Sequence, residues 1–153
     1  MKKFAVLLLA LSLVFSFAAC AKTAPAEDTA DVKGEGVMTY AEYDAAALES
    51  EVVVETYVQA KQSWWNDQAT LYTQDGDGAY FVYEAACSEE DYAKLTDGAK
   101  IRVTGYKGEW AGEVEIMDST IEILEGSYIA PVLDVTDKLG SDELADFQNF
   151  STF

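Results

Sequence analysis

Apolar and polar side chains alternate along the middle of this chain, which limits the folds open to it. Over residues 51–61 one side of the alternation carries Val52, Val54, Thr56, Val58 and Ala60, and the other carries Glu55, Tyr57, Gln59 and Lys61. A period of two is typical of a β-strand with one buried face. The same pattern predicts four further strands, over residues 69–74, 79–87, 100–106 and 113–124, the last bent near Asp118.

Turn and helix signals separate the predicted strands. Asp75-Gly76-Asp77-Gly78 predicts a tight hairpin turn between the second and third strands. Ser88 is a suitable cap for a short helix over residues 89–95, between the third and fourth strands. Two further short helices are predicted near the ends of the chain, over residues 40–48 and 142–150.

The predicted order of elements is three consecutive strands, a helix and a two-stranded hairpin. The same order is found in the OB-fold, a small Greek-key barrel of five strands. The segment 98–106 (Gly-Ala-Lys-Ile-Arg-Val-Thr-Gly-Tyr), followed by a turn and the alternating residues 113–116, resembles the fourth and fifth strands of bacterial OB domains. The resemblance spans residues 51–125 and rests on pattern. It implies a mainly β chain: a five-stranded OB-like Greek-key barrel with a helix between strands three and four, plus short N- and C-terminal helices.

The first 20 residues have the organisation of a secretory signal. Two lysines at positions 2–3 precede an apolar run over residues 4–17, and two alanines then precede Cys20. The apolar run is shorter than the roughly 20 residues that a membrane-spanning helix needs. Residues 17–20 (Phe-Ala-Ala-Cys) resemble the lipobox of bacterial lipoproteins, with phenylalanine in place of the usual leucine. The resemblance implies that Cys20 is lipidated and anchors the protein to the extracytoplasmic side of the cell membrane; the alternative is an ordinary signal peptide with a chance cysteine.

This interpretation divides the chain into four parts. Residues 1–19 are the signal peptide, and residues 20–36 are the lipidated cysteine with a flexible tether that has almost no large apolar side chains. Residues 37–130 form the OB-like barrel domain. Residues 131–153 form a C-terminal extension with the last short helix.

Charge and residue content argue against several classes of function. All 28 acidic residues follow Cys20, while two of the ten basic residues belong to the signal, so the mature chain has a net charge of −20. Such a field repels nucleic acid and anionic lipid headgroups. The chain has no histidine, the commonest general base and a usual zinc ligand. Cys87, without a disulfide partner if Cys20 is lipidated, is expected to be a small buried residue. We therefore expect no enzymatic activity, cofactor or metal.

The candidate site follows from the OB-like fold. OB-folds bind ligands on the face of strands two and three and at the loops that join strands one to two and four to five. These loops, expected at residues 63–67 and 107–112, contain the three tryptophans of the chain, and the fold is expected to bring them to one rim. The candidate ligand-binding residues are Trp64, Trp65, Trp110, Tyr57, Lys61, Tyr72, Arg102 and Tyr106.

Each of these signals has a structural alternative. A loop tryptophan can fold back and close the end of a barrel, and Trp64 is in phase with the inward side of its strand. Asp75-Gly76-Asp77-Gly78 faintly resembles a calcium loop but lacks the distal glutamate of an EF-hand, so a hairpin turn is preferred. Paired carboxylates could cleave glycosides, yet no pair stands out from the acidic residues of a solvated face.

The leading hypothesis is a membrane-anchored extracellular lipoprotein whose OB-like domain is a non-catalytic binding module for a glycan, a peptide or another envelope protein. The second is a structural accessory domain of an envelope assembly. Nucleic-acid binding is favoured by fold analogy alone. It is disfavoured by the acidity of the chain, because basic residues that neutralise phosphates supply most non-specific affinity.

Overall fold

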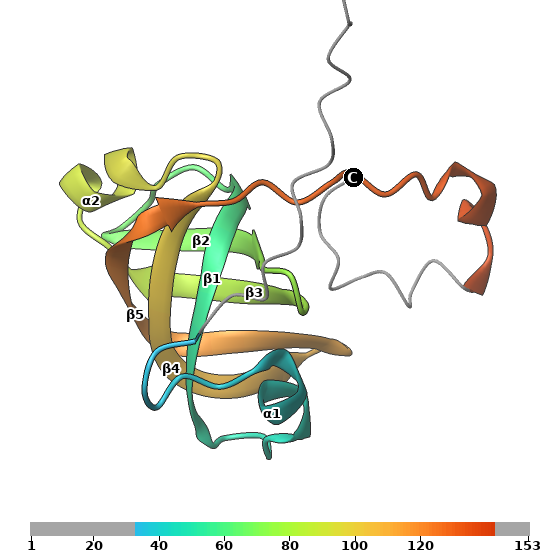
Figure 1. The fold of residues 1–153 in the computed structure, drawn as a ribbon, viewed down its shortest axis with the longest axis horizontal. Coiled ribbons are helices and arrows are strands. Elements are labelled where there is room, and N and C mark those ends of the chain that lie inside the picture. The colour runs from blue at the N-terminus through green and yellow to red at the C-terminus, as the bar shows by residue number, and fades with distance from the viewer. Residues whose placement is uncertain (1–32, 143–153) are drawn as a thin grey trace, which may run out of the picture.

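The alternating segment that starts at Glu51 becomes β1 (Glu51–Lys61), which pairs on one edge with β2 (Gln68–Gln74) and on the other with β4 (Ala99–Trp110). β3 (Ala79–Ala86) lies antiparallel to β2 and parallel to β5 (Glu113–Ser127), and β5 pairs with β4. The order β1-β2-β3-β5-β4 closes a barrel of mixed strands (Figure 1). The computed structural model describes residues 33–142, and their fold is the mainly β, five-stranded OB-like barrel that the sequence predicts.

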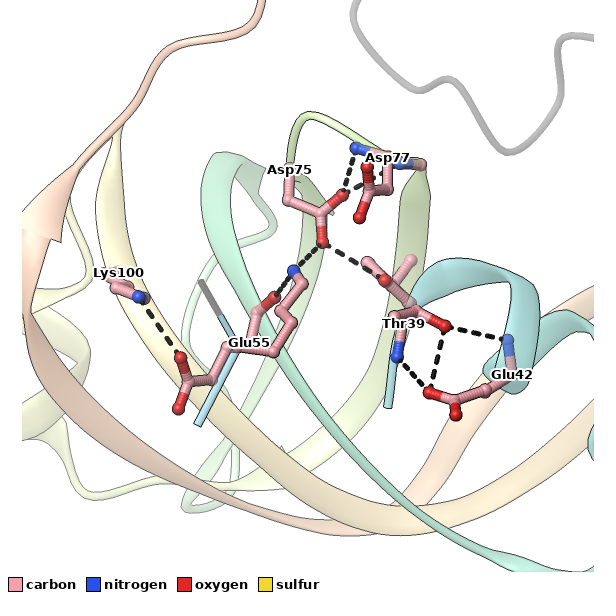
Figure 2. A network of polar contacts seen from close by, with 9 residues as sticks. Thr39, Glu42, Glu55, Asp75, Asp77 and Lys100 are labelled. Carbon is pink, nitrogen blue, oxygen red and sulfur yellow. Dashed lines mark hydrogen bonds and ion pairs between the residues drawn. The ribbon is translucent and has the colours of Figure 1, made fainter. Parts of the chain in front are cut away.

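The helices occupy the two ends of the barrel. α2 (Glu89–Lys94) connects β3 to β4 as predicted, and α1 (Tyr40–Ala45) lies at the opposite end (Figure 1). α1 begins at a capping box, in which the Glu42 carboxylate accepts a hydrogen bond from the Thr39 amide at 2.8 Å (Figure 2). α1 ends at Ala45, before the predicted end near Leu48, and a short 3-10 helix η1 spans Thr136–Lys138.

Two sequence predictions involve residues whose structure is not described. The signal peptide and Cys20 lie outside residues 33–142, and so does the predicted helix over residues 142–150, apart from its first residue. Within residues 33–142, no helix has the length and apolar character needed to cross a bilayer.

The interior of the barrel is apolar because the inward positions of every strand carry branched or aromatic side chains. The fully buried residues include Val52, Val54, Val58, Leu71, Tyr80, Val82, Ile101, Val103 and Ile116. Burial of one such side chain contributes roughly 1.5–3 kcal/mol, so these positions supply most of the stability of the barrel. Ala60 is exposed although the alternation places it inward, because a register shift between Val58 and Ala60 changes the phase of the strand.

The β4–β5 hairpin is longer than the sequence predicts. β4 continues to Trp110, so the predicted loop over residues 107–112 is reduced to Ala111 and Gly112. Both residues have positive φ angles, 52° and 93°, as in the type I′ turns that suit the twist of a hairpin. The predicted bend at Asp118 is confirmed: this residue has a φ of 48°, and the β4–β5 register shifts nearby.

The N-terminal segment joins the barrel earlier than the predicted domain boundary. Lys33, which the sequence places in the tether, donates hydrogen bonds to the Asp75 carboxylate and to the Glu55 carbonyl oxygen. The Met38 amide donates to the Val53 carbonyl at 2.8 Å. Figure 2 shows this region, in which Asp75 and Glu55 lie on neighbouring parts of the barrel. Within residues 33–142, Lys33 is thus already in contact with the barrel.

α1 is held against the barrel by aromatic contacts and one glycine. The Tyr43 ring packs edge-on against Tyr80 with 5.0 Å between ring centroids, and Tyr40 packs edge-on against the same ring at 5.5 Å. The ring of Tyr40 also occupies the space that a Cβ atom at Gly78 would fill. A larger residue at position 78 would therefore require the Tyr40 ring to move.

Candidate functional site

The three tryptophans do not share one rim. In the antiparallel pairing of β1 with β4, Glu51 lies opposite Tyr106 and Tyr57 lies opposite Lys100. The end of β1 that leads to Trp64 and Trp65 is therefore the end where β4 starts, whereas Trp110 is the last residue of β4. Figure 1 shows the β1–β2 connection on the side of α2 and the β4–β5 turn on the side of α1. The structure separates the two tryptophan loops by the length of the barrel.

Trp64 and Trp65 have different surroundings within the same loop. The half-buried Trp64 donates its indole N–H to the Cys87 carbonyl at 3.0 Å, which fixes it at the end of β3. Trp65 is 79% exposed and begins a tight turn that closes on Gln68. Trp110 is 76% exposed at the opposite end of the barrel.

The two basic candidate residues already have partners in the protein. The ammonium of Lys61 donates to the Tyr92 carbonyl at 2.8 Å and lies 3.8 Å from the centroid of the Tyr92 ring. It thereby fastens α2 to β1. The guanidinium of Arg102 pairs with Glu55 at 2.7 Å and with Glu122 at 2.9 Å. Both cations are therefore held by contacts within the protein, and Arg102 is largely neutralised by two carboxylates.

Glu55 is buried although it points to the outer side of the barrel. Its carboxylate also pairs with Lys100 at 3.2 Å (Figure 2). Burial alone would raise the pKa of Glu55, but hydrogen bonds and charge from Arg102 and Lys100 outweigh burial and lower it. A carboxylate with a lowered pKa stabilises the fold above its unfolded pKa of ~4.3, and this stabilisation is lost as the pH falls through the folded value.

We expect Glu55→Gln to lower the free energy of unfolding by about 1–2 kcal/mol at neutral pH, because two cations lose their counterion. The difference from the wild type should start to shrink as the pH falls below the unfolded value of ~4.3, and it should vanish below the lower folded pKa of Glu55, where the wild-type carboxylate is protonated in both states. Urea unfolding at a series of pH values measures both effects. Glu122→Gln is the control, since its exposed pair should change stability by less than about 0.5 kcal/mol. A difference that is constant with pH would contradict the prediction.

The remaining aromatic candidates differ in accessibility. Tyr57 is only 7% exposed, and its ring packs against Tyr128 at a centroid distance of 5.4 Å. Tyr106 is 46% exposed and lines a shallow cleft of about 540 Å³. Leu48 and Met117 line the same cleft. Tyr57 is therefore part of the packed structure, whereas Tyr106 can be reached by a ligand.

The most extensive aromatic contacts on the outside of the barrel lie on β2 and β3. The ring of Tyr72 stacks on Phe81 at 5.2 Å with an interplanar angle of 30°, and Phe81 contacts Tyr83 at 6.2 Å. Tyr83 is 40% exposed, and Tyr72 and Phe81 are half-buried. We call Tyr72, Phe81 and Tyr83 the aromatic strip.

Of these three, the sequence analysis names only Tyr72. The signal for the other two was present in the alternation of β3. Tyr80 and Val82 point inward and are fully buried, so Phe81 and Tyr83 must point outward. Their contact with Tyr72 depends on the β2–β3 register, in which Tyr72 lies opposite Phe81.

Two further predictions concern single residues. Asp75 is a turn residue: its Oδ1 accepts hydrogen bonds from the amides of Asp77 and Gly78, both at 2.8 Å (Figure 2). The hairpin prediction is thus confirmed.

Cys87 is buried, and burial is the main cause that raises the pKa of its thiol. Among residues 33–142, no group of three or more acidic, histidine or cysteine side chains is arranged to hold a metal ion.

Comparison with known proteins gives no family. No protein-family model matches the chain, and no curated protein matches it. Among solved structures, the chain is similar to asparaginyl-tRNA synthetase of Entamoeba histolytica in complex with asparaginyl-adenylate, with 13% sequence identity and a TM-score of 0.46. The match covers 68% of this chain and 28% of the synthetase chain, so it spans only a part of that enzyme.

Proposed function

We propose that this protein is a non-catalytic binding module, held at the extracytoplasmic side of the cell membrane by a lipid on Cys20, whose ligand docks on the aromatic strip. The observation that carries the proposal is the row of three rings on the outside of β2 and β3, in which Phe81 contacts both Tyr72 and Tyr83. In OB-folds the face of strands two and three is the usual ligand surface. Flat rings beside polar groups suit the stacking of a sugar ring or the side chains of a peptide.

The distribution of charge argues against a nucleic-acid ligand. Lys33, Lys61, Arg102 and Lys107 each contact a carboxylate or carbonyl oxygen of the protein itself. None of them lies on the aromatic strip. Base stacking without a basic groove gives weak affinity, because phosphate contacts supply most of the binding free energy.

We expect Phe81→Ala combined with Tyr83→Ala to weaken ligand binding by about ten- to a hundredfold, since each stacked ring contributes roughly 0.5–1.5 kcal/mol beyond its buried area. The measurement is calorimetric titration of the chain from Ala21 onward with peptidoglycan fragments, which offer both sugar and peptide groups, and with single-stranded DNA.

Trp65→Ala is the matched control, because it removes an exposed ring at the α2 end of the barrel. The proposal expects this variant to bind as the wild type does. If Trp65→Ala abolished binding while the double variant on the strip retained it, the ligand site would be the β1–β2 loop. If no ligand gave a heat of binding with the wild type or with any variant, a structural role in an envelope assembly would be the better explanation.

A further inference from the structure

Beside the aromatic strip lies a buried glutamate, Glu115, whose carboxylate has no partner among residues 33–142. Ile116 points into the barrel, so its neighbour Glu115 points outward, yet Glu115 is only 7% exposed. In the parallel pairing of β3 with β5, Val82 lies opposite Ile116, which places Glu115 next to Phe81 on the outer face. Within residues 33–142, no hydrogen bond or ion pair reaches the Glu115 carboxylate. The carboxylate oxygens keep some contact with water, but the charge is partly desolvated and lacks a counterion within the described residues, which is unfavourable.

The carboxylates of Glu113 and Glu84 act electrostatically on Glu115. Burial is the main cause that raises the pKa of Glu115, and the negative charges of Glu113 and Glu84 raise it further. Glu84 also raises the pKa of the neighbouring Tyr83 hydroxyl by accepting a hydrogen bond from it, and the charge of Glu115 contributes to this shift. We call Glu84, Glu113 and Glu115 the carboxylate cluster. It adjoins the aromatic strip through Tyr83 and Phe81.

We propose that the carboxylate cluster and the aromatic strip together bind a primary ammonium group of the ligand. This inference rests on the proposed function and names the chemistry of that same site. An ammonium over the strip would gain cation–π attraction from the Tyr83 and Phe81 rings and a charge-assisted hydrogen bond to Glu115. A related arrangement occurs within the chain, where the Lys61 ammonium lies 3.8 Å from the Tyr92 ring centroid and donates to the Tyr92 carbonyl oxygen.

Other charged ligands fit the same surface less well. An anion would be repelled by three carboxylates. A hard divalent cation takes at least six oxygen ligands in close geometry, whereas in the part of the chain that the structure describes no three acidic groups are arranged to hold a metal ion. A neutral sugar can stack on the strip, but it leaves the Glu115 charge uncompensated. An organic ammonium group satisfies both the rings and the carboxylate.

Two sources of a primary ammonium are the lysine side chain of a peptide and the amine of a deacetylated amino sugar. The test therefore uses pentalysine and a glucosamine tetramer, each beside its fully N-acetylated form. Calorimetric titration of the chain from Ala21 onward at near-neutral pH should show binding of at least one free amine and at least tenfold weaker binding of its acetylated form. Which amine binds identifies the source.

Glu115→Gln removes the buried charge while it keeps the shape of the side chain. We expect this variant to bind the amine probe about tenfold or more weakly, because a charge-assisted hydrogen bond is lost. Its Tm should be equal to or above that of the wild type, since an unpaired buried charge is removed. Glu89→Gln, at an exposed position of α2, makes the same change in net charge and should leave the affinity unchanged.

Three results would overturn the inference. Acetylated probes could bind as tightly as the free amines, Glu115→Gln and Glu89→Gln could weaken binding equally, or neither amine could bind. The first two leave the proposed function intact if Phe81→Ala with Tyr83→Ala still weakens binding of whichever probe the wild type binds. If the wild type bound none of the amine or acetylated probes and did not bind peptidoglycan fragments, both proposals would be wrong.

Discussion

Asp75→Ala is expected to lower the free energy of unfolding by about 3–5 kcal/mol, the range for breaking a buried charge pair by removing one partner. The Asp75 side chain is fully buried, and four donors converge on it. Besides the two turn amides, the Tyr80 hydroxyl donates to Oδ2 at 3.2 Å, and the Lys33 ammonium donates to the same oxygen. One carboxylate thus joins the β2–β3 turn, the core and the N-terminal segment.

The size of this effect follows from what the substitution leaves behind. Each buried donor that loses its acceptor costs roughly 1–3 kcal/mol. Lys33 would keep its hydrogen bond to the Glu55 carbonyl at 3.0 Å but would lose its counterion. Asp75→Asn retains an oxygen for the turn amides and removes the charge, so about half of the loss is expected for that variant. The comparison separates the turn from the ion pair.

Urea unfolding followed by circular dichroism measures these differences, provided that the slope against denaturant stays constant. Asp77→Ala is the control, because Asp77 lies in the same turn and its side chain is exposed. It should change stability by less than about 0.5 kcal/mol. If Asp75→Ala lowered the free energy of unfolding no more than Asp77→Ala does, the buried hydrogen bonds of Asp75 would not contribute measurably to stability.

Local patterns in the sequence were sufficient for the existence of the five strands, the β2–β3 turn and the starts of α1 and α2. Leu71 and the valines of β1 point inward as their alternation predicts, since period two is a property of the strand itself. The β4–β5 hairpin was predicted too short because Gly108 and Glu109 look like turn residues. In the structure both residues belong to β4 because they pair with β5: Gly108 lies opposite Glu115 and Glu109 lies opposite Val114.

The candidate site was harder to predict because it depends on register between distant segments. The positions of the tryptophans required the β1–β4 pairing, which no local pattern contains. The partners of Lys61 and Arg102 were equally hidden, since Glu55 lies 47 residues before Arg102. Phe81 and Tyr83, in contrast, could have been found by extending the alternation of β3 to its outward positions. What the sequence lacked was their contact with Tyr72.

The second large effect on stability is expected from removing the buried ammonium of Lys107. Lys107 is 6% exposed and donates to three carbonyl oxygens at the end of α1, those of Tyr43, Asp44 and Ala46, at 2.7–3.1 Å. The last carbonyls of a helix have no partners within the helix, and they carry its partial negative charge. Two of these carbonyls belong to the six-residue helix, and the third belongs to its C-cap residue Ala46.

Lys107→Met is expected to lower the free energy of unfolding by about 3 kcal/mol, because the side chain keeps its apolar stem and the carbonyls lose their donor. α1 should loosen, which exposes Tyr43 to water and weakens the near-ultraviolet circular dichroism of the packed tyrosines. Lys94→Met, at a half-exposed position of α2, is the control and should cost less than about 0.5 kcal/mol. An unchanged near-ultraviolet spectrum in Lys107→Met, together with wild-type stability, would show that α1 is held by its aromatic contacts alone. A lowered stability with an intact spectrum would instead mean that the cap stabilises the fold without positioning the helix.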